Sequence, residues 1–253
     1  MLGAADVSLF EFNHVTGARN GRTNSQEFAM RRLHGVVAAA MSLALYAAPR
    51  IVQAQTDGTC IPIAERAGRA LGCFITAREE LGALPSAPPL FWHLDTYPTV
   101  AAARAAAGAR GTVVESLGKI WLFTIGEAAY HPVSGTRVAR IGPLPLFPAA
   151  AYAATYMEGV FAPGMTSVVH RHPGAEAWFT LEGSMCVETP EGRQEQRAGD
   201  VGLLVPGGLP MILTGTGTQT RKSVVLILQD AALPRSMAAH DWMPRGLCAA
   251  PGK

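Results

Sequence analysis

Short apolar runs separated by Gly and Pro dominate the chain after Tyr130. Several such runs at close spacing, with turn signals between them, are typical of a β-sandwich or a small β-barrel. The pattern therefore predicts a mainly β structure for this part of the chain. The expected strands are Val138–Ile141, Ala151–Phe161, Thr166–His172, Ala175–Leu181, Met185–Glu188, Val201–Val205, Met211–Leu213 and Ser223–Leu228.

The residues before this region combine helical and extended patterns. Within Cys60–Glu80 the apolar residues recur at helical spacing, which predicts a short amphipathic helix, and residues 74–76 resemble a short strand. Phe91–Leu94 then resembles a strand, Thr99–Ala107 an Ala-rich helix with Thr99 as its N-cap, and Thr112–Ile125 extended structure. We therefore expect a small α+β element over residues 55–130.

An apolar run near the start of the chain has the features of a secretory signal peptide. Met30 is followed by two Arg residues, Val36–Ala48 is apolar, and small residues occur in Val52–Ala54. The run is too short for a transmembrane anchor, and it lacks the polar face of an amphipathic helix. We expect residues 1–54 to be an upstream extension and a signal peptide, and the protein to be secreted or periplasmic.

Composition and charge exclude several classes of protein. With 49% hydrophobic and 16% charged residues, the chain is too apolar for intrinsic disorder. The basic excess lies in residues 1–54, and the remaining residues carry equal numbers of basic and acidic side chains. A neutral chain without a basic stripe argues against nucleic-acid binding and against an anionic membrane surface.

All four cysteines lie in the part that would be exported. An even number of cysteines in an oxidising compartment favours two disulfides, although buried free thiols remain the alternative. We prefer the pairs Cys60–Cys73 and Cys186–Cys248, because each closes one end of the chain locally. The absence of a Cys-x-x-Cys motif argues against thiol exchange and a zinc ribbon.

A candidate metal site lies near the middle of the β-rich region. His170 and His172 are two residues apart, so on a strand both side chains project to the same face. The turn signal Pro173-Gly174 would return the chain and bring Glu176 to that face. Two imidazoles and one carboxylate predict a divalent metal site suited to iron, manganese, nickel, copper or zinc.

The same segment resembles the first conserved motif of the cupin superfamily, Gly-x5-His-x-His-x3-Glu-x6-Gly. Every position of that motif is filled, by Gly164, His170, His172, Glu176 and Gly183. The resemblance implies a single jelly-roll barrel, a bound metal and a small-molecule ligand or substrate. It also implies that two copies can pair as a homodimer.

The second cupin motif is recognisable but departs from the family pattern. Gly199 and Pro206–Gly208 match it with one extra residue between them, and Met211 stands where the family has its fourth ligand, a His. The resemblance implies a barrel over residues 131–229 with its core at 152–229. Residues 230–253 are then expected to form an irregular tail held by Cys248.

Met211 leaves three interpretations of the site open. His170, His172 and Glu176 could hold a metal alone, with open coordination positions. Met211 could ligate through its thioether, which prefers copper(I). Alternatively, Met211 could only fill the barrel, with no metal bound.

The strand that carries Glu176 predicts two further features of the barrel. Trp178 and Thr180 alternate with Glu176 and are expected to line the cavity. Phe179 and Leu181 then form an apolar outer face, which either the α+β element or a second subunit must cover. The other polar candidates are expected to be structural, exposed or solvated; they are Tyr156, Glu158, His93, His131, His240, Glu182, Glu188, Glu191 and Glu195.

Two classes of function fit these observations. One is a metal-dependent enzyme of the oxygenase, isomerase or lyase type, acting on a small oxygen-bearing molecule. The other is a non-catalytic periplasmic protein that binds a small ligand or a metal. The chain has no Gly-x-Ser-x-Gly elbow and no phosphate-binding loop, so neither hydrolase nor nucleotide chemistry is supported.

Overall fold

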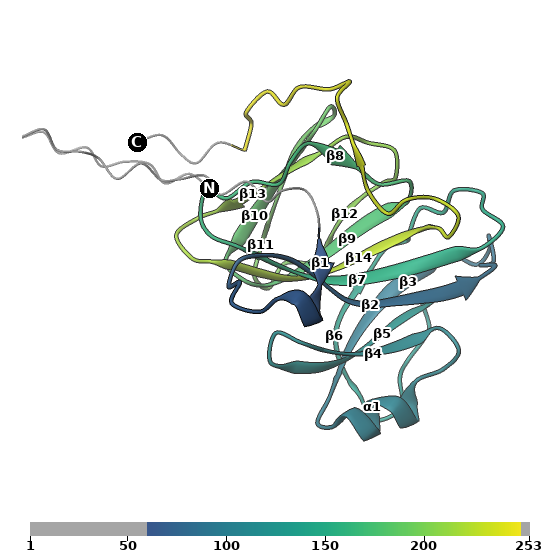
Figure 1. Cartoon of the computed structure of the whole chain (residues 1–253). Helices are drawn as coiled ribbons and strands as arrows, with labels where there is room; N and C mark the ends of the chain where they lie inside the picture. Colours follow the sequence, from purple (N-terminus) through teal and green to yellow (C-terminus); the bar gives the residue numbers. More distant parts are fainter. Residues whose placement is uncertain (1–59, 249–253) are drawn as a thin grey trace, which may run out of the picture. The chain divides into compact units, whose positions relative to one another are not determined.

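Strands dominate the computed structural model, which describes residues 60–248 (Figure 1). The expected leader over residues 1–54 lies outside the described residues. The first part of the described chain contains β1 (Ile61–Pro62), the 3-10 turn η1 (Ile63–Glu65), β2 (Gly72–Gly82), β3 (Leu90–Tyr97), α1 (Val100–Ala106), β4 (Gly111–Ser116), β5 (Lys119–Glu127) and β6 (Thr136–Ile141). The second part contains β7 (Tyr152–Phe161), β8 (His170–Arg171), β9 (Ala175–Glu182), β10 (Ser184–Thr189), β11 (Gly192–Arg197), β12 (Leu203–Val205), β13 (Ile212–Thr216), β14 (Arg221–Asp230) and β15 (Met237–Ala238).

Two facing sheets form a jelly-roll barrel, as the sequence predicted. One sheet has the strand order β1-β2-β7-β14-β9-β12, the other has the order β11-β10-β13, and β15 pairs with β8. Side chains from both sheets meet in one apolar cluster that fills the barrel; they include Met157, Trp178, Met185, Val187, Leu213 and Val225. Alternate residues of each strand therefore point into the barrel.

A four-stranded sheet outside the barrel, which we call the second sheet, covers the outer face of the barrel. It has the order β4-β5-β3-β6, and its Trp92, Trp121 and Phe123 share an apolar cluster with residues of β7, β9 and β14. The ring of Phe123 stacks on that of Tyr156, with 5.0 Å between their centroids. Every residue of β7 is buried because both faces of this strand are covered.

The chain itself supplies the cover that the outer face of β9 requires. Phe179 and Leu181 pack against the cluster between the two sheets. Of the two expected alternatives, the α+β element and a second subunit, the first therefore accounts for this face.

The expected helix within Cys60–Glu80 is wrong. This segment forms β1, η1 and β2, and β2 pairs with β7 along most of its length. Gly68 and Gly72 have positive φ angles of 76° and 134°, which an α-helix does not allow. The ladder to β7 outweighs the helical spacing of the apolar residues.

The other expected elements of the first part are present. The helix α1 follows Thr99, whose side chain accepts a hydrogen bond from the backbone N–H of Ala102 at 3.1 Å. Strands β4 and β5 flank a turn at Gly118, where φ is +72°. The expected boundary at residue 130 does not separate the barrel from the second sheet. β2, which precedes it, joins the barrel, and β6, which follows it, joins the second sheet.

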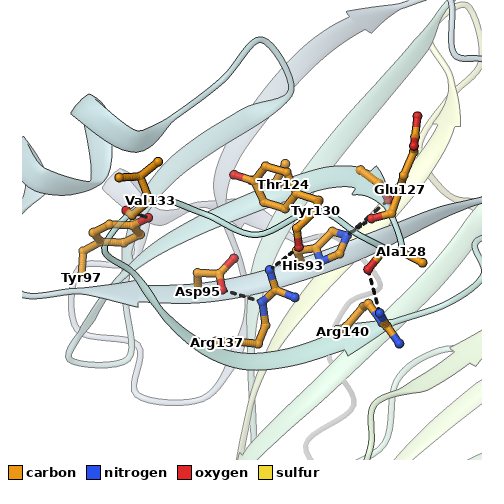
Figure 2. A network of polar contacts seen from close by, with 11 residues as sticks. His93, Asp95, Tyr97, Thr124, Glu127, Ala128, Tyr130, Val133, Arg137 and Arg140 are labelled. Atoms are coloured by element: carbon orange, nitrogen blue, oxygen red, sulfur yellow. Dashed lines mark hydrogen bonds and ion pairs between the residues drawn. The ribbon is translucent and has the colours of Figure 1, made fainter.

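A buried polar network ties the strands of the second sheet together (Figure 2). On β3, His93 Nε2 donates to the carbonyl of Glu127 at 2.9 Å, and the Asp95 carboxylate pairs with the guanidinium of Arg137 on β6. Burial, and then the charge of Arg137, lower the pKa of His93 to about 4. This imidazole is therefore neutral and structural, one of the roles expected for it.

Both expected disulfides are present. Cys60–Cys73 links the residue before β1 to β2, and Cys186–Cys248 links β10 to the last described residue of the tail. No cysteine of the described chain is free.

Candidate metal centre

The structure brings the three predicted ligands together. His170 lies on β8, His172 follows it, and Glu176 is the second residue of β9. One potential ligand atom from each residue lies within 4.8 Å of the other two. His172 and Glu176 are buried, and His170 is half-buried. The strand periodicity and the intervening turn therefore produce the convergence that the sequence predicted.

Glycines hold the turn between His172 and Glu176 in place. A Cβ at Gly174 would lie 1.9 Å from the carbonyl oxygen of Leu228, and a Cβ at Gly207 would lie 2.7 Å from the Cα of Gly174. The backbone N–H of Gly208 donates to the carbonyl of His172 at 2.7 Å. The glycines of the second motif thus position the first motif by close backbone contact.

Backbone carbonyls orient both imidazoles. His170 Nδ1 lies 2.9 Å from the carbonyl of Val168, and His172 Nδ1 lies 2.6 Å from that of Arg235. Because a carbonyl only accepts, Nδ1 carries the proton in both rings. Each Nε2 of a neutral ring is then left with a free lone pair, which is the arrangement that orients metal-binding histidines.

The unsatisfied atoms at the centre of the site fit a metal ion. His172 Nε2 and Glu176 Oε2 are 2.9 Å apart and buried. Apart from each other, neither atom has a hydrogen-bond partner within residues 60–248. Buried lone pairs without donors are costly, and a divalent cation would satisfy them together with His170 Nε2.

The two histidines differ in their electrostatic surroundings. Burial, and then the neighbouring His172, lower the pKa of His170. Burial also opposes a charge on His172, but the Glu176 carboxylate outweighs it and raises the pKa of that imidazole. A metal ion must compete with a proton for His172 Nε2, so binding should weaken as the pH falls.

Met211 lies directly beside His170. The two residues exchange backbone hydrogen bonds of 3.1 and 2.8 Å, and paired residues of antiparallel strands point to the same side. The Met211 side chain is 1% exposed and belongs to the apolar cluster inside the barrel with Trp178 and Val205. Its packing favours a filling role for Met211 over ligation by its thioether.

A cavity inside the barrel opens onto the three candidate ligands. About 60 Å³ of it is available to the centres of water molecules, which is room for a small molecule or several waters. Trp178 lines this cavity as expected, whereas Thr180 is buried against Ser223 and Gln196 instead. The Cys60–Cys73 disulfide forms part of the wall.

Sequence reasoning missed two charged residues of this cavity. Arg221 at the start of β14 and Arg235 in the tail both line it. Neither residue belongs to a motif or has a spacing signal, and Arg221 stands next to Lys222 at what resembles an exposed strand end. Only the tertiary fold shows that Arg221 points inward.

The expected solvated position of Glu188 is wrong. This residue is 1% exposed, and its carboxylate accepts hydrogen bonds from the backbone N–H groups of Arg245 and Leu247. Glu158 and Tyr156 lie on the outer side of β7, where Glu158 pairs with Arg66 at 2.9 Å and Tyr156 packs between the sheets.

Several solved structures are similar to part of the chain. A cupin-like protein from Thermotoga maritima matches at 15% identity and a TM-score of 0.30, over 35% of this chain and 64% of its own. A cupin superfamily protein from Desulfitobacterium hafniense matches at 18% identity and 0.27, over 34% of this chain and 73% of its own. An oxalate oxidase in complex with glycolate matches at 22% identity and 0.28, over 34% of this chain and 45% of its own.

The matched region thus spans less than two thirds of the first and third of these structures. No protein-family model and no curated protein matches the chain. In the described residues, His170 lies on β8, Glu176 lies on β9 and His172 lies between them, and a Cβ at Gly207 of the second motif would contact the turn at Gly174. The strands form a two-sheet jelly roll. The chain therefore has the jelly-roll fold that its resemblance to cupins implied.

Proposed function

We propose that this chain is a secreted or periplasmic cupin protein that holds a divalent metal with His170, His172 and Glu176 and acts on a small oxygen-bearing molecule. The observation that carries this proposal is the orientation of the three side chains. Both imidazoles donate Nδ1–H to backbone carbonyls, and the remaining nitrogen and carboxylate atoms converge without other partners.

Iron, manganese, nickel, copper and zinc all suit two imidazoles and one carboxylate. When bound, such an ion polarises an oxygen atom of a substrate or activates dioxygen, which is compatible with oxygenase, isomerase or lyase chemistry. Met157, Phe161 and Trp178 give the cavity around the ligands a largely apolar wall. Open coordination positions would leave room for a substrate.

A non-catalytic binding protein is the second candidate. Within residues 60–248, the wall of the cavity contains no ionisable side chain other than the three ligands, Arg221 and Arg235. No separate carboxyl, imidazole or phenol is therefore available as a general acid or base. A reaction here would depend on the metal, and a protein without one would be a ligand binder.

Metal analysis of the protein purified from its native compartment separates these candidates. A redox-active metal at one ion per chain supports the enzyme. An empty, folded barrel supports the binding protein and removes the basis for metal chemistry.

Export is supported by the leader pattern and by two disulfides in the described chain. No helix within residues 60–248 is long and apolar enough to cross a membrane. Mass spectrometry of the protein expressed with its own leader should show loss of residues 1 to about 54. Mature protein that retains residues 30–54 would contradict export. Pairing as a homodimer and the lack of nucleic-acid binding remain predictions.

A further inference from the structure

Arg221 is a buried cation in the wall of the barrel cavity. Its side chain is 1% exposed, and its Nε donates to Ser223 Oγ at 2.7 Å. Ser223 in turn contacts Thr180 at 3.0 Å. The guanidinium lies over Gly159, where even a Cβ would come within 3.4 Å of both Nη atoms. The side chain is therefore held in one place by its neighbours.

This cation makes no salt bridge in the described part of the chain, where the Glu176 carboxylate acts on it only from beyond 4.0 Å. No carboxylate oxygen lies within 4.0 Å of it, and its Nη2 has no hydrogen-bond acceptor. The ring of Phe161, 5.3 Å from Cζ, offers partial compensation. Burial lowers the pKa of Arg221 to about 10, so the group remains charged at neutral pH. A buried, unpaired charge of this kind is costly and calls for a counter-ion.

The charges that face the cavity favour an anion. Its wall contains one carboxylate, Glu176, and two guanidinium groups, those of Arg221 and Arg235. The Nε atom of Arg235 also lacks an acceptor. Since a metal on Glu176 would add further positive charge, the cavity carries excess positive charge with or without the metal.

We propose that Arg221 binds the carboxylate of a small organic acid in this cavity. A guanidinium presents parallel N–H donors that match the two oxygens of a carboxylate. The walls beside it are apolar, with Met157, Trp178 and Val225, and so suit a short carbon chain.

The proposal rests on the proposed function only in treating this acid as the substrate. Binding of a carboxylate to Arg221 does not require the metal. The two ideas therefore fail separately when the same ligand is tested on protein with and without a metal ion.

The test uses the full chain, dialysed against a chelator and, in parallel, reloaded with zinc. Acetate and its neutral analogue acetamide are titrated while the side-chain Nε–H signals of arginine are followed by NMR. Acetate should shift the signal of a buried arginine in both preparations, and acetamide should not at the same concentration. This comparison needs no variant, so it remains decisive even if substitutions of Arg221 impair folding.

Two variants locate the site. In Arg221→Met, which removes the charge and keeps an unbranched apolar side chain, acetate affinity should fall at least about tenfold in the metal-free protein. Arg193→Met changes an exposed arginine and should leave that affinity unchanged. Binding in the metal-free protein with no zinc uptake would support Arg221 while removing the proposed metal site.

Three results would overturn the assignment of Arg221. The first is that acetamide binds with the same affinity as acetate. The second is that a folded Arg221→Met protein keeps its full affinity for acetate. The third is that acetate binds only after zinc is added. The last two, together with stoichiometric zinc, would leave the proposed metal site intact.

Discussion

Met211 takes the place of the fourth ligand, yet its environment is that of a core residue. It is almost fully buried among apolar side chains and touches His170 through the backbone. Met211→Leu should therefore leave the affinity for every metal unchanged and alter stability by less than about 1.5 kcal/mol. Calorimetric titration with zinc, nickel and copper(I) checks the affinities, and urea unfolding checks the stability.

The reciprocal variant Met211→His should raise the affinity for iron, nickel or zinc, because it adds a third imidazole beside His170 as the fourth ligand. A selective loss of copper(I) binding in Met211→Leu would instead identify the thioether as a ligand.

At the scale of single residues, the sequence predicts what depends on local geometry. His170, His172 and Glu176 follow from the two-residue period of strands and one turn. The burial of Glu188 and the inward position of Arg221 do not follow, since both depend on segments distant in the chain. Charged residues are mostly exposed, so a buried one contradicts the usual expectation.

At the scale of structural elements, the two motifs meet at the turn that contains Gly174, where the backbone of Gly207 packs against it. Gly207→Ala places a methyl group against the backbone of Gly174, and overpacking of this kind costs about 1–3 kcal/mol. The variant should lower both the stability and the metal occupancy, because the same turn carries His172 to its position. Chemical denaturation and metal analysis measure the two effects.

Gly108→Ala is the matched control for this variant. Its added methyl group would meet nothing within 4 Å, and its backbone is not in the left-handed region. A Gly207→Ala protein as stable and as metal-loaded as Gly108→Ala would contradict the role given to the glycine contact.

The polar network of the second sheet predicts a dependence of stability on pH (Figure 2). The pKa of His93 is lowered to about 4, so the unfolded chain, with an ordinary histidine, binds the proton more readily. The contribution of His93 to the free energy of unfolding is fully present above about pH 6.5 and declines as the pH falls toward 4. The loss at pH 4.5 should be about 2.5 kcal/mol.

Urea unfolding at pH 7 and at pH 4.5 measures this loss. Comparison with His93→Gln, which keeps an N–H donor but does not titrate, removes the contribution of other groups. Equal pH dependence in the two proteins would show that His93 is not the source.

Several strands were predictable from local pattern, whereas β2 was predictable only in part and β11 was not. β7 and β14 are continuous apolar runs because both of their faces are covered, and such runs are visible in the sequence. β2 has a helical spacing of apolar residues before it and charged residues within it, so the sequence indicated a strand only at residues 74–76, and the pairing with β7 extends it. The polar β11 has no apolar pattern to reveal it.

The disulfides act on the molecule as a whole. Cys186–Cys248 spans 62 residues and Cys60–Cys73 spans 13, and cross-links that close longer loops restrict the unfolded chain more strongly. Replacing both cysteines of the longer link by alanine should cost about 4 kcal/mol, against about 3 kcal/mol for the shorter. Urea unfolding of the two double variants provides the comparison, and a larger loss for Cys60–Cys73 would contradict it.

The arrangement of the whole molecule was predictable only in outline. A β-barrel with a smaller element before it follows from the distribution of strands and turns. The placement of β2 in the barrel and of β6 in the second sheet does not follow from the sequence, since both strands pair with distant partners. Because β2 carries Cys73 into the barrel, the Cys60–Cys73 disulfide lies in the cavity wall.

The central claim is that His170, His172 and Glu176 bind a metal, and a matched pair of histidine variants tests it most directly. Calorimetric titration of the chelator-treated protein with zinc should give one site per chain, which His172→Ala abolishes, because two ligands rarely hold a borderline ion. His240→Ala, which changes an exposed histidine outside the site, should bind as the unmodified protein does. Unchanged zinc binding in a folded His172→Ala protein would contradict the account.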